Sequence, residues 1–291
     1  MALAEPDCGA PLRVRPLSPF AAECEGIDLN RPLDDAGQAA VRGAFLAHQL
    51  LAFPGQAVEK ASQIRFARYF GEIEMPVNRD YLGRDYPELH VVSNLDAEGR
   101  PTAAKALANP GNYFWHSDAS YMRRPASATI LHAVRIPESG GDTSFANLHL
   151  AYEALPEGMR RRIERLRAVH SWAQSRLNSG SRPATEEEQR LAPPVAHPLV
   201  RTHPETGRKG LYLGNHTAHI EGMPEAEGRA LLKDLLEHTV QPRFVYRHRW
   251  RPGDLVMWDN RSLLHRASDD YDMEREIRLL HRTVVQGTVP A

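Results

Sequence analysis

The sequence predicts a mainly β fold with flanking helices, in the α+β class. Strand-like apolar runs are concentrated in the centre and the C-terminal half, whereas helical patterns lie near the start or between the strands. The 22 prolines are spread through the chain, which suits many short strands joined by turns. The sequence has no internal repeat. Its length of 291 residues and its composition suit one large domain over residues 1–291, or one domain with a substantial insert.

Helical periodicity and capping residues mark four segments. Asp34 can cap the first helix, and Gly71 can end the second, where a left-handed residue is needed. Pro224 can open the last helix, which carries a stripe of buried leucines. The predicted helices are residues 34–49, 58–70, 157–166 and a segment from residue 224 onward.

Strands are predicted from short runs of apolar and β-branched residues. The runs are residues 12–15, 50–53, 89–93, 128–136, 199–202, 243–246, 254–258 and 277–285. Residues 140–143 indicate a turn that leads into a further strand, with Thr143 offering a hydroxyl donor.

Composition excludes several classes of partner. The formal net charge is -1, with 42% hydrophobic and 25% charged residues, so neither a nucleic acid nor an anionic membrane is expected as a partner. Cys8 and Cys24 are too few for a disulfide framework and are predicted to be reduced. No apolar run approaches the roughly 20 residues of a membrane span. The first residues lack a secretory signal, so a cytoplasmic protein is expected.

Two segments are predicted to be loops that can act as lids. Residues 96–111 are rich in small residues and directly precede the histidine motif described next, and residues 178–194 are rich in serine and glycine and then in glutamate. Solvated surface loops are the alternative for both.

A His-x-Asp pair and a distant histidine suggest a metal site. His116 and Asp118 lie two residues apart, so on a strand or at its end their side chains would share a face. With His265 they would form the two-histidine, one-carboxylate set of non-haem Fe(II) oxygenases, which leaves three positions open. Taken singly, each residue also suits an ordinary structural role. Most of the 14 histidines are expected to be bystanders, among them His90, His132, His149, His170 and His238.

Two arginines near the C-terminus suggest anion binding. In an extended strand, Arg278 and Arg282 face the same way as Leu280. Buried arginines are costly unless each meets an anion, and a guanidinium matches a carboxylate with two parallel hydrogen bonds. A strand whose arginines face solvent is the alternative.

Taken in order, these motifs resemble the taurine/2,4-dichlorophenoxyacetate dioxygenase (TauD/TfdA) family of Fe(II)/2-oxoglutarate enzymes, over nearly the whole chain. The motifs are residues 115–118, 140–143, 258–265 and 278–282. Three further segments resemble the phenoxyacetate branch, namely residues 198–204, 214–222 and 246–250.

The resemblance implies a double-stranded β-helix (jelly-roll) core flanked by helices. It implies Fe(II) on His116, Asp118 and His265, with 2-oxoglutarate and O₂ as co-substrates. It also implies that Thr143 and Arg278 hold the distal carboxylate of 2-oxoglutarate.

The primary substrate site is also suggested by the resemblance. Asn112 and Arg282 match positions at or near the primary substrate, and His203 and His216 are candidate pocket residues or core residues. Met75 stands where taurine-specific members carry a sulfonate-binding histidine, so taurine is not the expected substrate.

The expected function is oxygenation of a small organic acid, most simply an aryloxyalkanoate-like carboxylate, with release of succinate and CO₂. A sulfonate or sulfate-ester oxygenase of the same family is the first alternative. A Zn(II) hydrolase is another, in which Asp142 or Asp259 would serve as acid and base. A non-catalytic jelly-roll that binds 2-oxoglutarate is a third. The resemblance also implies a homo-oligomer, either a dimer or a tetramer.

Overall fold

The structure, a computed structural model, describes residues 12–75 and 85–291, and Cys8 and the first residues lie outside this part. Its largest sheet has seven strands in the order β1-β2-β3-β13-β5-β15-β4, antiparallel except for the β2–β3 pair. The strands are β1 (Arg13–Ser18), β2 (Ala21–Glu25), β3 (Leu50–Phe53), β4 (His90–Ser93), β5 (Ala126–Arg135), β13 (Leu255–Asp259) and β15 (Leu279–Gln286).

A three-stranded sheet faces the large one and closes the jelly-roll core. Its order is β12-β6-β14, from β12 (Val245–His248), β6 (Thr143–Asn147) and β14 (Leu263–Ala267). Phe145 and Leu263 of this sheet form one apolar cluster with Trp258 and Leu280 of the large sheet. The core therefore lies between the two sheets, as in a sandwich.

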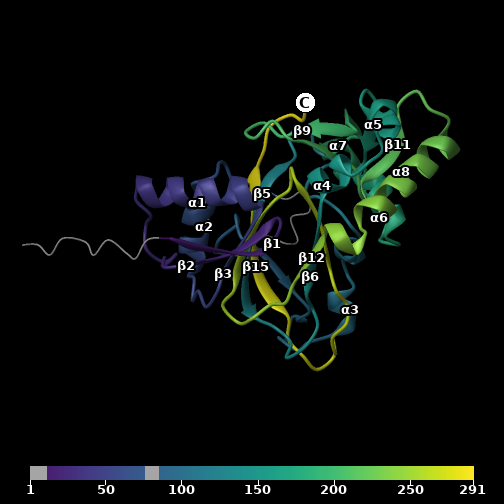
Figure 1. Cartoon of the computed structure of the whole chain (residues 1–291). Helices are drawn as coiled ribbons and strands as arrows, with labels where there is room; N and C mark the ends of the chain where they lie inside the picture. The colour runs from purple at the N-terminus through teal and green to yellow at the C-terminus, as the bar shows by residue number, and fades with distance from the viewer. Residues whose placement is uncertain (1–11, 76–84) are drawn as a thin grey trace, which may run out of the picture.

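The outer face of the large sheet is covered by α1 (Asp35–His48) and α2 (Lys60–Arg68), which Figure 1 shows in violet and blue. Successive side chains of β13 point to opposite faces of the sheet, so this strand packs on both sides. Leu255 and Met257 join the cluster that contains Phe45 of α1, whereas Val256 and Trp258 point into the sandwich.

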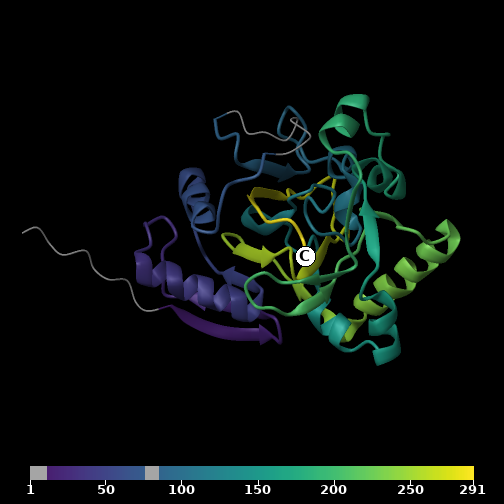
Figure 2. The same cartoon turned by 90° about the horizontal axis from the view of Figure 1, so that it is seen from above.

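A long insertion between β6 and β12 forms the other side of the molecule (Figures 1 and 2). It contains the small sheets β11-β7-β8 and β10-β9, packed with helices around a separate apolar cluster. Its strands are β7 (Arg167–His170), β8 (Val195–Pro198), β9 (Val200–Thr202), β10 (Lys209–Leu211) and β11 (Thr217–Ile220). Its helices are α4 (Leu148–Glu153), α5 (Glu157–Ile163), α6 (Trp172–Asn178), α7 (Glu186–Leu191), α8 (Glu225–Thr239) and the 3-10 turn η3 (Pro242–Phe244).

The predicted α+β class and the four predicted helices are confirmed. The side chain of Asp34 caps α1 by accepting a hydrogen bond from the Gly37 amide at 2.7 Å. The helix predicted to reach residue 166 ends at Ile163, about one turn early. The strand predicted at residues 243–246 begins at Val245, because η3 occupies the preceding residues. Cys24 is a buried free thiol, and burial raises its pKa to about 12.

The two predicted lid segments contain regular structure. Residues 96–111 include α3 (Ala103–Ala106) and the start of the 3-10 turn η2 (Pro110–Tyr113). Residues 178–194 include α7, whose first turn is closed by a reciprocal capping box between Thr185 and Glu188. Among the described residues, no helix is both long enough and apolar enough to cross a membrane.

Candidate active site

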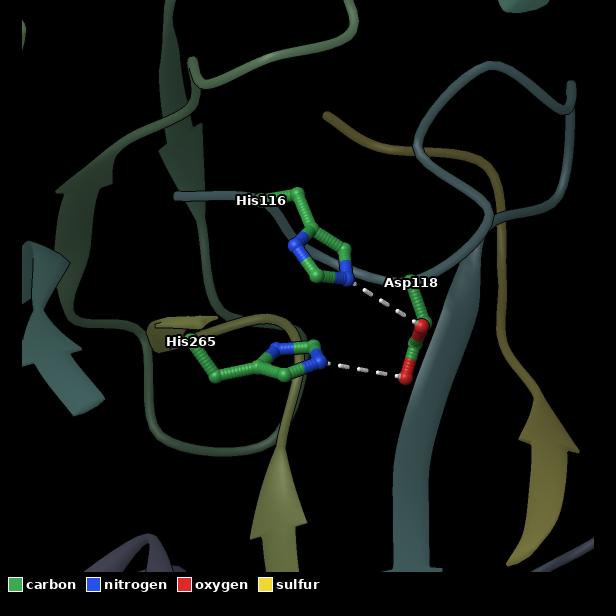
Figure 3. Close-up of side chains that lie close together, drawn as sticks. All are labelled: His116, Asp118 and His265. Atoms are coloured by element: carbon green, nitrogen blue, oxygen red, sulfur yellow. Dashed lines mark ion pairs between the residues drawn. The ribbon is translucent and has the colours of Figure 1, made fainter. Parts of the chain in front are cut away.

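The three predicted metal ligands converge, and His265 packs against the core residues Phe145 and Trp258. One ligand atom from each of His116, Asp118 and His265 lies within 4.8 Å of the others, and all three residues are buried (Figure 3). The Nε2 atoms of His116 and His265 face the two carboxylate oxygens of Asp118 at 3.9 Å and 3.7 Å.

Backbone pairing brings the two histidines together. His116 and His265 form an isolated antiparallel bridge, with N–H···O distances of 3.1 and 2.8 Å. Asp118 does not continue a strand, as the sequence suggested, but lies in the following turn, where Ala119 has a φ of 52°. His116 and Asp118 therefore face the same way because one lies in a β-bridge and the other in the turn after it, and not because both lie on one strand.

Asp118 is held by residues that the sequence analysis did not single out. Thr129 of β5 donates a hydrogen bond to its Oδ2 at 2.6 Å, and its backbone N–H donates to Asn260 Oδ1 at 3.1 Å. Asn260 also donates to Thr129 Oγ1 at 2.9 Å and accepts from Trp258 Nε1 at 3.2 Å. In the sequence, the motif at residues 258–261 was part of the family resemblance, but no role was assigned to Asn260.

The donor set fits a divalent metal. The backbone carbonyl of Phe114 lies 2.7 Å from His116 Nδ1 and can only accept, so His116 carries its proton on Nδ1 and Nε2 is free to bind a metal. Burial lowers the pKa of His116 and of His265. Burial alone would raise the pKa of Asp118, but Arg282 and the two imidazoles lower it below its usual range. Ligands that are deprotonated at neutral pH are those that a metal needs.

A cavity of about 390 Å³ lies against this triad. One group of its lining residues is polar and lies around Arg278, including Asn94, Tyr113 and Tyr271. A second group contains Arg282 with Glu74, His90 and Tyr121, which lie within its electrostatic influence, and the rings of Trp172 and His216 pack against Tyr121. Both predicted lid segments contribute lining residues, among them Lys105, Ala106, Asn109, Ser179 and Ser181.

Arg278 is a buried cation that faces the cavity. Its Nε donates to the carbonyl of Gly141 at 2.9 Å, and its backbone N–H donates to Asn94 Oδ1 at 2.9 Å. It forms no ion pair with a carboxylate of residues 12–75 or 85–291. Burial lowers the pKa of Arg278, an unfavourable environment that a bound carboxylate would relieve.

Thr143 lies two residues after Gly141, at the start of β6, and is buried. Its hydroxyl oxygen accepts a hydrogen bond from Trp250 Nε1 at 3.0 Å, which leaves the hydroxyl proton available to a ligand. Thr143 is not among the described residues that line the cavity, so its predicted contact with 2-oxoglutarate stays a prediction.

Arg282 lies beside the metal ligands. Its guanidinium is 3.4 Å from Asp118 Oδ1 and its side chain is 26% exposed. Asn112 and His216 also line the cavity, and their predicted contact with substrate stays a prediction. The ring of His216 packs edge-on against His116, with ring centroids 5.9 Å apart.

One predicted pocket residue needs correction, and two neighbouring placements were not foreseen. His203 lies away from the cavity: its Nε2 contacts Asp259 at 3.0 Å and its Nδ1 accepts from two backbone amides, so both ring nitrogens have structural partners. Met75 is 49% exposed, and Glu74 is the residue of this segment that lines the cavity. His90, expected to be a bystander, lines the cavity as well.

The carboxylates of a Zn(II) hydrolase are not at the metal site. Asp142 is paired with Arg247 at 2.7 Å. Asp259 is bound by Arg261 at 2.7 Å and by His203. Neither carboxylate is left to serve as the acid or base of that mechanism.

Comparison with known proteins identifies the family. The family model "Taurine catabolism dioxygenase TauD, TfdA family" matches residues 13–284. The chain belongs to this family. It is therefore an oxidoreductase, and the expected dependence on Fe(II), 2-oxoglutarate and O₂ is confirmed by the family together with the His116–Asp118–His265 triad.

Several relatives of this TauD/TfdA-family dioxygenase match over most of their length. The alpha-ketoglutarate-dependent 2,4-dichlorophenoxyacetate dioxygenase of Cupriavidus pinatubonensis is 43% identical, over 90% of this chain and 94% of the relative. The (S)-phenoxypropionate/alpha-ketoglutarate-dioxygenase of Sphingobium herbicidovorans is 38% identical, over 91% of each chain. The crystal structure of AAD-2 in complex with Mn(II) and N-oxalylglycine has a TM-score of 0.87 and 39% identity, and covers 96% of this chain and 98% of its own. This likeness confirms the jelly-roll fold.

Proposed function

We propose that this dioxygenase oxygenates an aryloxyalkanoate-like carboxylic acid, consuming 2-oxoglutarate and O₂ and releasing succinate and CO₂. The observation that carries the proposal is the position of Arg282. Its only carboxylate contact among the described residues is with Asp118, a predicted metal ligand. A metal on Asp118 takes up that negative charge, which leaves Arg282 for the anionic group of a substrate.

The cavity also offers an aromatic wall for the rest of such a substrate. The rings of Tyr121 and Trp172 lie 4.9 Å apart at 50°, and Val284 lines the same space. Aryl rings pack well against such surfaces. The two relatives named for aryloxy acids support this substrate class.

The protein's residues have separate tasks in this mechanism. His116, Asp118 and His265 would hold Fe(II), which with 2-oxoglutarate and O₂ supplies the oxidising power. Arg278, assisted by Thr143, would orient the distal carboxylate of 2-oxoglutarate through charge-assisted hydrogen bonds. Arg282 would fix the substrate's anionic end, so that distance alone decides which C–H bond is presented to the metal.

We also propose that residues 96–111 and 178–194 act as lids, because both contribute side chains to the cavity. Residues 1–291 would then form one domain, with the insertion between β6 and β12 as part of the same site. The expected dimer or tetramer is checked by light scattering.

The test begins with an anaerobic titration with Fe(II) and 2-oxoglutarate. Oxygen is then admitted with a panel of aryloxy acids, alkyl sulfonates and sulfate esters while succinate is measured. We expect substrate-dependent succinate with the aryloxy acids, and turnover of sulfonates or sulfate esters alone would point to the other branch of the family. Absence of succinate with every compound would contradict catalysis and favour a 2-oxoglutarate-binding protein.

Arg282→Ala tests the anion-binding role. A hydrogen bond to a charged group is worth about 1.5–3 kcal/mol, so KM for the acid should rise roughly 10- to 100-fold. The affinity for 2-oxoglutarate should change little. Arg229→Ala, on the exposed face of α8, is the control. Equal loss of binding for neutral and acidic analogues would contradict the role of Arg282.

A further inference from the structure

A tyrosine that the sequence analysis did not single out lines the cavity together with Arg278. Tyr271 lies in the loop between β14 and β15, and Ala267, Tyr271 and Arg278 of this segment all line the cavity. The loop therefore carries two polar side chains to the same space, a phenol from its middle and a guanidinium from its end.

The loop is fixed to the glycine turn before β6. The carboxylate of Asp270 accepts hydrogen bonds from the Gly141 amide at 3.0 Å and from Arg247 Nη2 at 2.5 Å. Gly140 makes this approach possible, because a Cβ at that position would collide with the carbonyl oxygen of Asp270. Tyr271 therefore directly follows a residue whose position is fixed by three contacts.

A second anchor holds the loop on the other side of Tyr271. The side-chain amide of Asn94 donates to the carbonyls of Met273 and Glu276 at 3.0 and 2.8 Å. The Oδ1 atom of Asn94 accepts from the backbone N–H of Arg278 at 2.9 Å. Because the backbone is held on both sides of Tyr271, few positions are open to its side chain.

The phenol of Tyr271 lies within the electrostatic field of Arg278. Tyr271, Tyr113 and Asp142 favour the charged form of Arg278, and Tyr271 has the largest effect of the three. Burial raises the pKa of Tyr271 to about 12, while the charge of Arg278 opposes the shift. The hydroxyl therefore keeps its proton at neutral pH, and it forms no hydrogen bond with the described part of the chain.

A carboxylate bound at Arg278 has room for a further donor. The Nε atom of Arg278 already donates to a backbone carbonyl, so its two terminal nitrogens remain, whereas a carboxylate offers about four acceptor positions. Thr143, the donor expected from the sequence, is not among the described lining residues. Tyr113 lines the cavity, but its hydroxyl donates to the carbonyl of Ala106 at 3.4 Å. The hydroxyl of Tyr271 is the donor that remains.

We propose that Tyr271 is a further binding residue for the co-substrate: its hydroxyl donates a hydrogen bond to the distal carboxylate of 2-oxoglutarate and so helps to select a 2-oxo acid that carries a second carboxylate. A ligand without that carboxylate would leave both the phenol and Arg278 desolvated and unpaired, which is how buried polar groups reject an analogue. The inference rests on the proposed role of Arg278 and is independent of the primary substrate.

Binding can be measured without turnover. Mn(II)-loaded protein is titrated calorimetrically with N-oxalylglycine, an unreactive analogue that keeps both carboxylates. Tyr271→Phe removes only the hydroxyl and should raise the Kd of N-oxalylglycine roughly 10- to 100-fold, the value of a hydrogen bond to a charged group. The second ligand is 2-oxopentanoate, which has the same chain length but no distal carboxylate, measured by competition with N-oxalylglycine. Its Kd should be nearly the same in parent and variant.

Two further tyrosine variants make the test specific. Tyr246→Phe is the matched control, because Tyr246 lies on β12 and is not among the described lining residues, so both Kd values should be kept. Tyr113→Phe should have a smaller effect than Tyr271→Phe. If Tyr271→Phe weakens both ligands equally, the residue only shapes the cavity and the proposal is wrong. A selective loss in Tyr113→Phe alone would assign the donor to the other phenol and also overturn it.

The remaining outcomes separate this inference from the proposed function. If Arg278→Ala weakens N-oxalylglycine binding and Tyr271→Phe does not, Arg278 holds the carboxylate without Tyr271 and only the inference fails. If neither variant changes the Kd, the distal carboxylate is bound elsewhere and the roles of both residues fail. A failure to oxidise aryloxy acids would contradict the substrate proposal, while a selective loss in Tyr271→Phe would still support the inference.

Discussion

The metal end and the substrate end of the cavity differ in how their polar atoms are satisfied. At the metal end, both oxygens of Asp118 face protein groups, and Thr129 and Asn260 fix the residue. At the substrate end, four atoms of cavity-lining residues are buried without a hydrogen-bond partner among the described residues: Glu74 Oε2, His90 Nε2, Trp172 Nε1 and Arg282 Nε.

This difference indicates which residues await a ligand. An unsatisfied buried polar group costs about 1–3 kcal/mol, and most such groups in native proteins have partners. Four of them around one cavity are therefore best explained by a polar substrate that completes them. His265 Nδ1 is the exception at the metal end, since it too has no partner among the described residues.

The largest effect is expected at the metal end. Replacing His265 with alanine removes one of three ligands and should abolish activity and stoichiometric metal binding while the fold persists. Metal content and circular dichroism measure the two outcomes. His281→Ala, on β15 of the large sheet, is the control and should keep its metal. Retention of one bound metal in His265→Ala would break the assignment of the triad.

The next effect concerns 2-oxoglutarate. Removing one partner of a buried charge pair costs about 3–5 kcal/mol, so Arg278→Ala should weaken 2-oxoglutarate binding by two orders of magnitude or more. Anaerobic titration of the metal-loaded protein measures it. Arg278→Lys should recover part of the affinity because it keeps the charge but not the planar fork. An unchanged affinity in Arg278→Ala would show that the carboxylate is bound elsewhere.

A smaller effect is expected from the residues that hold Asp118. Substitutions of groups that orient metal ligands typically cost 10- to 100-fold in metal affinity or activity. Asn260→Ala removes both the acceptor for the Asp118 amide and the donor to Thr129. Asn147→Ala is a matched control, because Asn147 is equally buried but caps α4. Equal loss of metal affinity in both variants would reduce Asn260 to a general structural role.

The sequence predicted the parts of this site that depend on spacing along the chain. His116, Asp118, His265 and Arg278 belong to compact motifs, and strands 50–53 and 254–258 follow directly from their apolar runs. The sequence did not predict Glu74 or His90 as cavity residues, because their positions follow from pairing beside β15. His203 was misplaced because an isolated histidine has the same appearance whether it faces a ligand or a buried aspartate.

The smallest expected effect concerns the protonation of Glu74 at the substrate end of the cavity. Burial raises the pKa of Glu74 to about 8, and the charge of Asp118 raises it further, while Arg282 opposes the shift. The folded protein thus binds this proton more tightly than the unfolded chain, so its stabilising effect is present at acid pH and is lost as pH rises toward 8. In metal-free protein, the free energy of unfolding of Glu74→Gln relative to the parent should therefore improve as pH rises through this window.

The same proton should matter to substrate binding. Near pH 6 the carboxylic acid and the amide of Glu74→Gln are alike in shape and charge, so KM for the acid substrate should be nearly the same in parent and variant. Above pH 8 the parent's Glu74 ionises beside Arg282 and competes with the anionic substrate for it, so KM should rise in the parent and stay flat in the variant. Glu72→Gln, an exposed neighbour, is the control. KM values that rise equally in parent and variant would show that Glu74 does not share the substrate's end of the cavity with Arg282.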